Sequence, residues 1–210
     1  MTCVRLPFLL AVLLAASACS EDAAVTLQGN SADAAAGTDV YVVANPPVLT
    51  NAAVPTGPYA HVSGQWQGDR NRLVVEVRVG GSVDVVGLAG QLTWDPAVLR
   101  LESTAVNDEL LVDDPSIWSQ RSLVKETPAG RLLLGSARFR TTSSPWLQVE
   151  SFRITNAKWL TLTYEVLGKG DTAIAFDPTT TVVRNELGAQ QKLTWTAVQV
   201  AVPADFVPAK

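Results

Sequence analysis

The chain has few of the residues on which most enzymes and metal sites depend. Its 210 residues include one histidine, His61, and two cysteines. A catalytic triad would have to use His61, and no G-x-S-x-G nucleophile turn is present. The same count excludes a zinc site built from histidine and cysteine side chains. We therefore expect a protein that is not an enzyme and holds no metal or cofactor of its own.

Carboxylates are the one catalytic class that the composition leaves open, because the spacing of a glycosidase pair is spatial rather than sequential. Asp108, Glu109, Asp113 and Asp114 could also supply oxygen ligands to calcium, but EF-hand spacing is absent. A solvated acidic loop is the favoured interpretation, and we expect any calcium to belong to a partner. The remaining acidic candidates lie on predicted strands and are Glu102 and Glu165.

Basic runs and helical periodicity are also missing. The formal net charge is −4, and no cluster of Lys and Arg exists that could bind nucleic acid. Twelve prolines and fourteen glycines are spread along the chain, and short apolar runs recur every 8–12 residues. This spacing predicts an all-β protein, an antiparallel β-sandwich. A short helix between Asn107 and Trp118 is the expected exception.

The clearest strand signal lies at residues 85–95. One parity is apolar and predicts a buried face, whereas the other is small or polar and predicts a face toward water. Asp95-Pro96 then ends the strand, because proline lacks an N–H and the aspartate side chain can cap the turn. The buried parity holds Leu88, Gly90, Leu92 and Trp94; the outward parity holds Gly87, Ala89, Gln91 and Thr93.

Two later features of the alternation bear on the site. Gly80-Gly81 is expected to break the strand that begins near Leu73. In the apolar run after Lys158, strict alternation places Trp159 on the outward parity, with Leu160 and Leu162 on the buried one.

The N-terminus reads as an export signal. Arg5 precedes an apolar stretch from Leu6 to Leu14, and small residues lead to Cys19. The position of Cys19 resembles a bacterial lipobox, in which the cysteine is lipidated. The alternative is ordinary signal cleavage that leaves Cys19 as a free thiol, which is unusual because exported proteins normally pair their cysteines.

The expected organisation follows from these signals. We assign residues 1–18 to the signal peptide, 19–57 to the lipidated cysteine and a flexible linker, and 58–205 to the β-sandwich domain. Residues 39–58 could instead add an edge strand. The protein is then expected in the bacterial cell envelope, at the outer membrane or cell surface, attached to the membrane through its lipid anchor alone.

Five segments in order resemble cohesin modules: Gly-Asp before RLVVEVRV, then GQLTWDPAVLRL, GRLLLGSARF, KWLTLTYEVLGKGDTAIAF and GAQQKLTWTAVQV. The resemblance covers roughly residues 60–202. It implies a jelly-roll sandwich of about nine strands, with one flat sheet face that binds a dockerin-bearing secreted protein. Dockerins are small calcium-loaded modules, so calcium would again lie on the partner.

The resemblance also implies where the partner binds. In cohesins the contact residues lie on the strand before Asp-Pro and on the mid-domain strand. Those positions are here Gly87 and Ala89, where well-studied cohesins tend to carry polar or acidic groups, and Gly135 and Ser136 on the mid-domain strand. The candidate partner-binding residues are Ala89, Gln91, Thr93, Ser136 and Arg138.

Two other function classes compete with protein docking. A carbohydrate-binding module would use aromatic side chains exposed along one face, for which Trp118, Trp146 and Trp159 are the candidates. A structural envelope lipoprotein would have no dedicated ligand. An exposed tryptophan row favours sugar, and a flat polar face favours docking.

Overall fold

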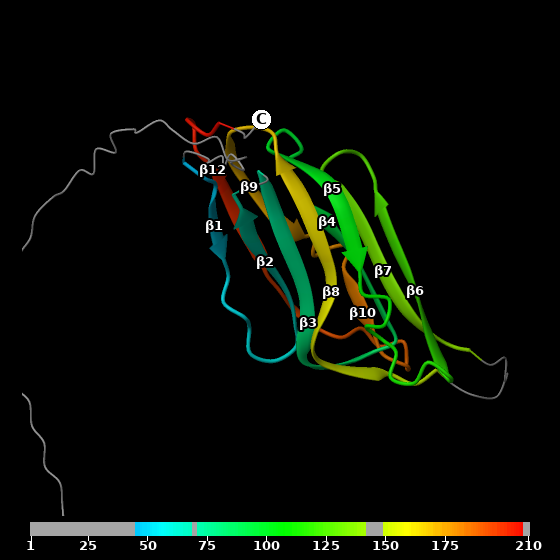
Figure 1. Cartoon of the computed structure of the whole chain (residues 1–210). Helices are drawn as coiled ribbons and strands as arrows, with labels where there is room; N and C mark the ends of the chain where they lie inside the picture. Colours follow the sequence, from blue (N-terminus) through cyan, green and yellow to red (C-terminus); the bar gives the residue numbers. More distant parts are fainter. Residues whose placement is uncertain (1–44, 69–70, 142–148, 208–210) are drawn as a thin grey trace, which may run out of the picture. The chain divides into compact units, whose positions relative to one another are not determined.

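The computed structural model describes residues 45–68, 71–141 and 149–207, all within one compact unit, Asp39–Lys210. Two β-sheets pack face to face, and no helix occurs among the described residues (Figure 1). Accordingly, nothing in this part of the chain is helical and apolar over a length that could cross a bilayer. The expected antiparallel β-sandwich is confirmed, with twelve strands in place of about nine. The predicted signal peptide, Cys19 and Trp146 lie outside the described residues.

The first sheet has seven strands. Six of them follow the order β1-β12-β9-β4-β7-β6, and the seventh, β10, pairs with the part of β4 that β9 does not reach. All of these pairings are antiparallel. The strands are β1 (Val48–Asn51), β4 (Gly87–Thr93), β6 (Trp118–Glu126), β7 (Arg131–Arg140), β9 (Gly170–Phe176), β10 (Val182–Arg184) and β12 (Ala197–Val202).

The second sheet has five strands in the order β11-β2-β3-β8-β5, with only the β11–β2 pair parallel. Its strands are β2 (Tyr59–Gln67), β3 (Arg72–Val85), β5 (Leu99–Val106), β8 (Phe152–Val166) and β11 (Thr194–Trp195). In Figure 1, β3, β8 and β5 form the layer nearer the viewer.

The predicted strand before Asp-Pro forms β4 with the expected parity. Leu88 and Leu92 are buried in the core between the sheets, as is Trp94, whose indole N–H donates to the Leu99 carbonyl at 3.0 Å. The Asp95 carboxylate accepts the Ala97 amide at 2.8 Å, which is the predicted cap of the turn.

Three local expectations are wrong. The segment from Asn107 to Ile117 forms hydrogen-bonded turns rather than a helix. Gly80-Gly81 does not end its strand, because β3 continues to Val85 through a register shift. Gly81 has φ +79° there, and a Cβ on it would lie 1.7 Å from the Gly57 carbonyl oxygen, so only glycine fits.

The third wrong expectation concerns Trp159, which is 1% exposed rather than outward. Leu160 pairs with Val77 while Lys158 pairs with Arg78, so Trp159 is an extra residue without a partner on β3. This β-bulge resets the alternation and turns the indole into the core. There it stacks on Phe176 with ring centroids 6.1 Å apart.

The sandwich also begins earlier than residue 58. β1 pairs with β12 from Val48↔Ala201 to Asn51↔Val198, which realises the edge strand that residues 39–58 were considered able to add. At the other end, Phe206 is 3% exposed and packs edge-on against Trp66. The core therefore draws on residues on both sides of the expected domain boundaries.

His61 makes the stability of this fold depend on pH. Burial, and then the nearby Arg78 cation, lower the pKa of His61 below its ordinary value, and its Nδ1 lies 3.0 Å from the Thr196 hydroxyl. The unfolded chain gains a proton near pH 6.5, at which the folded chain keeps His61 neutral. Stability should therefore be full above about pH 6.5 and fall as the pH drops below it. Urea unfolding of the wild-type chain and of His61→Gln at pH 7.5 and 5.5 should show a smaller loss in the variant; equal losses would contradict this.

Candidate functional site

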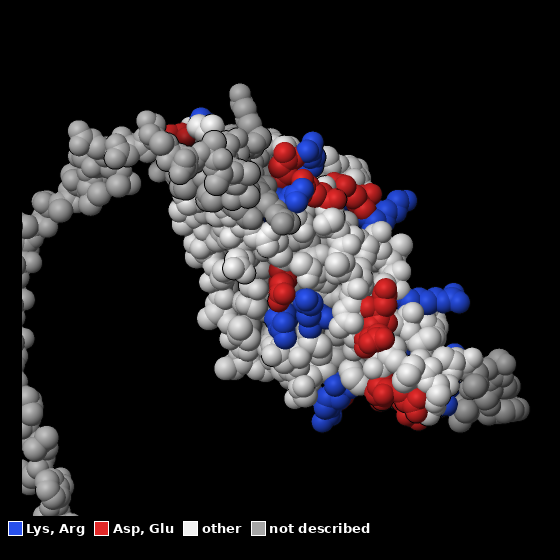
Figure 2. Space-filling model, viewed as in Figure 1, with Lys and Arg blue, Asp and Glu red and all other residues white. Residues whose placement is uncertain are grey.

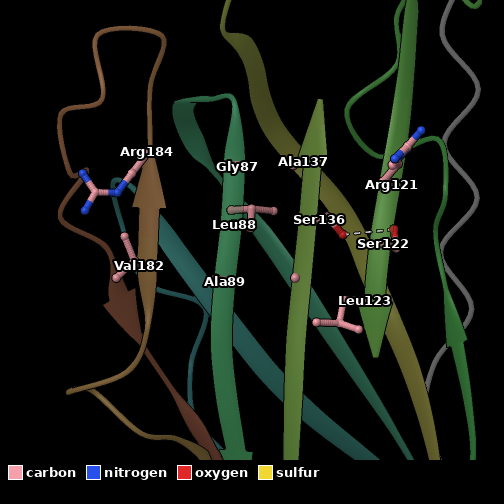
Figure 3. A pocket seen from close by; sticks show the side chains of 11 residues that line it. Gly87, Leu88, Ala89, Arg121, Ser122, Leu123, Ser136, Ala137, Val182 and Arg184 are labelled. Atoms are coloured by element: carbon pink, nitrogen blue, oxygen red, sulfur yellow. Dashed lines mark hydrogen bonds between the residues drawn. The ribbon is translucent and has the colours of Figure 1, made fainter. Parts of the chain in front are cut away.

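The outward face of β10, β4, β7 and β6 carries a hollow of about 510 Å³, the trough, shown in Figure 3. Two cross-strand rows build it. One runs Arg184–Gly87–Ala137–Arg121, and the other runs Val182–Ala89–Gly135–Leu123. In each row the two central residues are glycine and alanine and the two outer residues are large. The trough therefore has a nearly bare backbone floor between side-chain walls.

The glycines of the floor have no backbone reason to be glycine. Neither Gly87 nor Gly135 has a positive φ. A Cβ on Gly87 would come no closer than 3.7 Å to another atom, and one on Gly135 no closer than 3.8 Å. Both distances are ordinary van der Waals contacts. A glycine inside a strand weakens it and often marks the close approach of a ligand or another backbone.

The walls of the trough are exposed and partly apolar. The Leu123 side chain on the edge strand β6 is 58% exposed, although leucine is normally buried. On the adjacent strand β7, Phe139 is 41% exposed. The Arg121 guanidinium lies over its ring, 5.6 Å from the ring centroid. Exposed apolar side chains gathered on one face, here on either side of Arg121, are typical of an interaction site.

Three of the five predicted partner-binding residues face outward on β4. Ala89 lies in the floor of the trough, pairing with Gly135 on one side and Val182 on the other. Gln91 and Thr93 continue the same face beyond the trough, and the Thr93 hydroxyl donates to the Ala175 carbonyl at 3.4 Å. Their role in binding remains a prediction.

Ser136 lines the trough from below, because its side chain has the inward parity of β7. It is 2% exposed, and its hydroxyl accepts the Trp159 indole N–H at 3.0 Å inside the sandwich. Ser122 and Gln120 on β6 complete this polar network below the floor of the trough. Ser136 therefore holds the bulged Trp159 in place, and its role in partner binding remains a prediction.

Arg138 is also buried, with 2% of its side chain exposed. Its guanidinium lies 3.8 Å from the Trp118 ring centroid, donates to the Leu111 carbonyl at 2.8 Å, and pairs with Asp113 at 2.9 Å. The inward parity of β7 directs it under the loop that precedes β6. Its prediction as a partner-binding residue is therefore corrected: it fastens this loop to the sheet.

The predicted tryptophan row is not present. Trp118 is 5% exposed beneath the Arg138 guanidinium, and Trp159 is buried by its bulge. Two of the three candidates for sugar stacking are thus core residues, and the third lies outside the described residues. In the part of the chain that the structure describes, no three His, Cys, Asp or Glu side chains gather in an arrangement able to hold a metal ion.

The opposite sheet offers a different surface. Figure 2 shows red and blue side chains intermingled over the layer of β3, β8 and β5. Its arginines are neutralised in pairs: Arg72 with Glu102, Arg100 with Glu165, and Arg153 with Asp84. The last pair is bidentate, and its hydrogen bonds lower the pKa of Asp84. This is how an ordinary solvated sheet face looks.

Comparison with known proteins then identifies the fold. No protein-family model and no curated protein sequence matches this chain. A solution structure of CaCohA2, a cohesin from Clostridium acetobutylicum, superposes with a TM-score of 0.52 at 16% identity, covering 71% of this chain and 93% of that one. The chain has a cohesin-like fold.

Two further solved cohesins are also similar to the domain. The sixth cohesin of scaffoldin B from Acetivibrio cellulolyticus, in complex with a Cel5 dockerin, has a TM-score of 0.46 at 14% identity, covering 68% of this chain and 97% of its own. The second type II cohesin of the adaptor scaffoldin ScaA from the same organism has a TM-score of 0.46 at 14% identity, with coverages of 75% and 94%.

Sequence reasoning missed most of the trough walls of this cohesin-like domain. Gly87 and Gly135 were singled out as departures from the resemblance, but Val182, Arg184, Arg121 and Leu123 were not predicted as site residues. Leu123 stands at every-second-residue spacing between Arg121 and Lys125 on β6. Two charged residues on one parity are a signal that could have placed Leu123 on the outward face. β10 has three residues and gives no such signal.

Proposed function

We propose that this cohesin-like domain is a non-catalytic module that binds a protein partner in the trough. The observation that carries the proposal is the pair of floor glycines, which open a hollow where the backbone requires none. Exposed Leu123 and half-exposed Phe139 supply the apolar surface from which protein interfaces gain their affinity. A cohesin of this fold is known in complex with a dockerin, which makes a dockerin-type module the first partner to test.

Affinity capture with the full chain tests this function. The bait is exposed to secreted and envelope proteins of the source organism, once with calcium and once with chelator. Baits with Leu123→Glu and Leu167→Glu are compared, because both leucines are exposed, at 58% and 45%, but only Leu123 lines the trough. We expect a partner that Leu123→Glu loses and Leu167→Glu keeps. A dockerin-type partner should require calcium, and capture that is equal for all three baits would contradict docking in the trough.

We also propose that the chain is exported and held in the cell envelope by a lipid on Cys19. The support is the sequence of the first nineteen residues, with an apolar stretch followed by small residues and the cysteine. A chain with Cys19→Ala should leave the membrane fraction and lose incorporation of labelled palmitate. If the Cys19→Ala chain stays in the membrane fraction and still incorporates palmitate, the lipid anchor is refuted. The docking proposal does not depend on this result.

A further inference from the structure

The charged residues on the strands of the trough are mostly basic. β4, β6, β7 and β10 contain six basic residues and one acidic residue, Glu126. Two of the six, Arg138 and Arg140, have the inward parity of β7, so the outward basic residues are Arg121, Lys125, Arg131 and Arg184. The whole chain, in contrast, has a formal net charge of −4. Glu126 has the parity of Val124, which packs against the core, so the outward positions of these four strands hold no carboxylate. An acidic chain thus presents one locally basic sheet face.

The basic side chains at the trough are held in place without being neutralised. Within the described residues, Arg121 and Arg184 form no ion pair, whereas the arginines of the opposite sheet are paired with carboxylates. Arg121 stacks on Phe139, and Arg184 donates to the Gly188 carbonyl at 2.6 Å. Two positioned guanidinium groups thus keep their full charge available for an external carboxylate.

The two arginines lie at opposite walls of the trough (Figure 3). They are the ends of one cross-strand row, with Gly87 and Ala137 between them. Three strand spacings separate them, so their Cα atoms lie about 14 Å apart. The neighbouring row is apolar throughout, from Val182 to Leu123. The surface is therefore an apolar hollow between two cations.

We propose that the occupant of the trough is a protein segment in which a large apolar side chain is flanked by carboxylates. The apolar side chain fills the hollow over Gly87 and Gly135, and the carboxylates bind Arg121 and Arg184. This inference rests on the proposed docking function and adds the chemistry of the partner. It excludes a partner whose contact surface is basic, because such a surface would bring like charges together.

A polysaccharide fits this surface less well. Sugar rings stack on aromatic faces and need hydrogen-bonding groups around them. The floor is made largely of glycine and alanine, and the Ser136 hydroxyl beneath it is already engaged by the Trp159 indole and the Ser122 hydroxyl. Phe139, the aromatic side chain on the outward face of these strands, is already in contact with Arg121.

A display library of random 12-residue peptides, selected on the immobilised full chain, tests the proposal. The selected peptides should share an aromatic or branched apolar residue with Asp or Glu on both sides. Their affinity should fall about tenfold, equivalent to about 1.4 kcal/mol, for Arg121→Gln/Arg184→Gln, and the salt dependence of binding should weaken. The control is Arg100→Gln, a similarly exposed arginine on the opposite sheet, which should change nothing.

The outcomes separate the partner chemistry from the docking function. Neutral or basic peptides that bind equally well to the Arg121→Gln/Arg184→Gln chain, yet are lost on Gly135→Leu, would overturn the acidic partner and leave docking in the trough intact. Docking itself would be overturned if no peptide is selected. It would also be overturned if the selected peptides bind the Arg121→Gln/Arg184→Gln chain and the Gly135→Leu chain as tightly as the wild-type chain. Arginine-dependent binding of polygalacturonate without any selected peptide would assign the trough to an acidic polysaccharide and overturn both.

Discussion

Filling the floor of the trough is expected to abolish partner binding while leaving the fold intact. In a chain with Gly87→Leu and Gly135→Leu, the added side chains occupy the space that the proposed occupant needs. Affinity for the captured partner should fall at least about 100-fold, the loss expected when a central interface contact is removed. The Cβ atoms fit at 3.7 and 3.8 Å from their neighbours, so the strands do not have to move.

The stability of the double variant shows whether lost binding is due to the filled trough or to unfolding. Replacing a strand glycine reduces the conformational entropy of the unfolded chain, so the thermal unfolding midpoint of the double variant should be no lower than that of the wild-type chain. Calorimetric titration and thermal unfolding on the same samples check both halves. Unchanged affinity in a folded double variant would show that the partner does not enter the trough.

Replacing Arg138 should instead lower the stability of the fold. Arg138→Ala removes the guanidinium from Trp118, leaves the Leu111 carbonyl without its donor and opens a cavity under the loop. We expect a loss of about 2–4 kcal/mol in the free energy of unfolding, typical of a large buried side chain with hydrogen bonds. Urea unfolding measures it.

Arg121 on the neighbouring strand is the matched control for this prediction. It is exposed on the outward face, and Arg121→Ala should change stability by no more than about 0.5 kcal/mol. Arg138→Met, which keeps part of the aliphatic packing over Trp118, should fall between wild type and Arg138→Ala. A fully stable Arg138→Ala chain that fails to bind its partner would restore Arg138 as a contact residue.

Local rules were sufficient where strand period and turn chemistry act alone. The alternation through β4 predicted that Leu88 and Leu92 are buried, and Asp95 predicted the capped turn. The resemblance to cohesins, carried by five such segments in order, predicted the fold that the superposition on CaCohA2 shows. The buried parity and the capped turn each depend on neighbours within a few residues along the chain.

The errors occurred where contacts between distant strands decide the outcome. Trp159 faces inward because a bulge against β3 inserts one residue into β8. The sequence of β8 alone does not predict this bulge. Three consecutive leucines at the start of β7 hide its parity, so Ser136 and Arg138 could not be placed on the inward side. The trough itself exists only because the register aligns Gly87 with Ala137 and Ala89 with Gly135, on two strands that are far apart in the sequence.

The most direct measurement of the central claim is site-specific photo-crosslinking of the captured partner. A photoreactive amino acid is placed at Leu123, on the wall of the trough, and in a second chain at Thr163, on the outer face of the opposite sheet. Docking in the trough predicts a crosslinked complex from position 123 and none from position 163. Crosslinking from position 163 alone would show that the partner binds the other sheet and would contradict the proposed site.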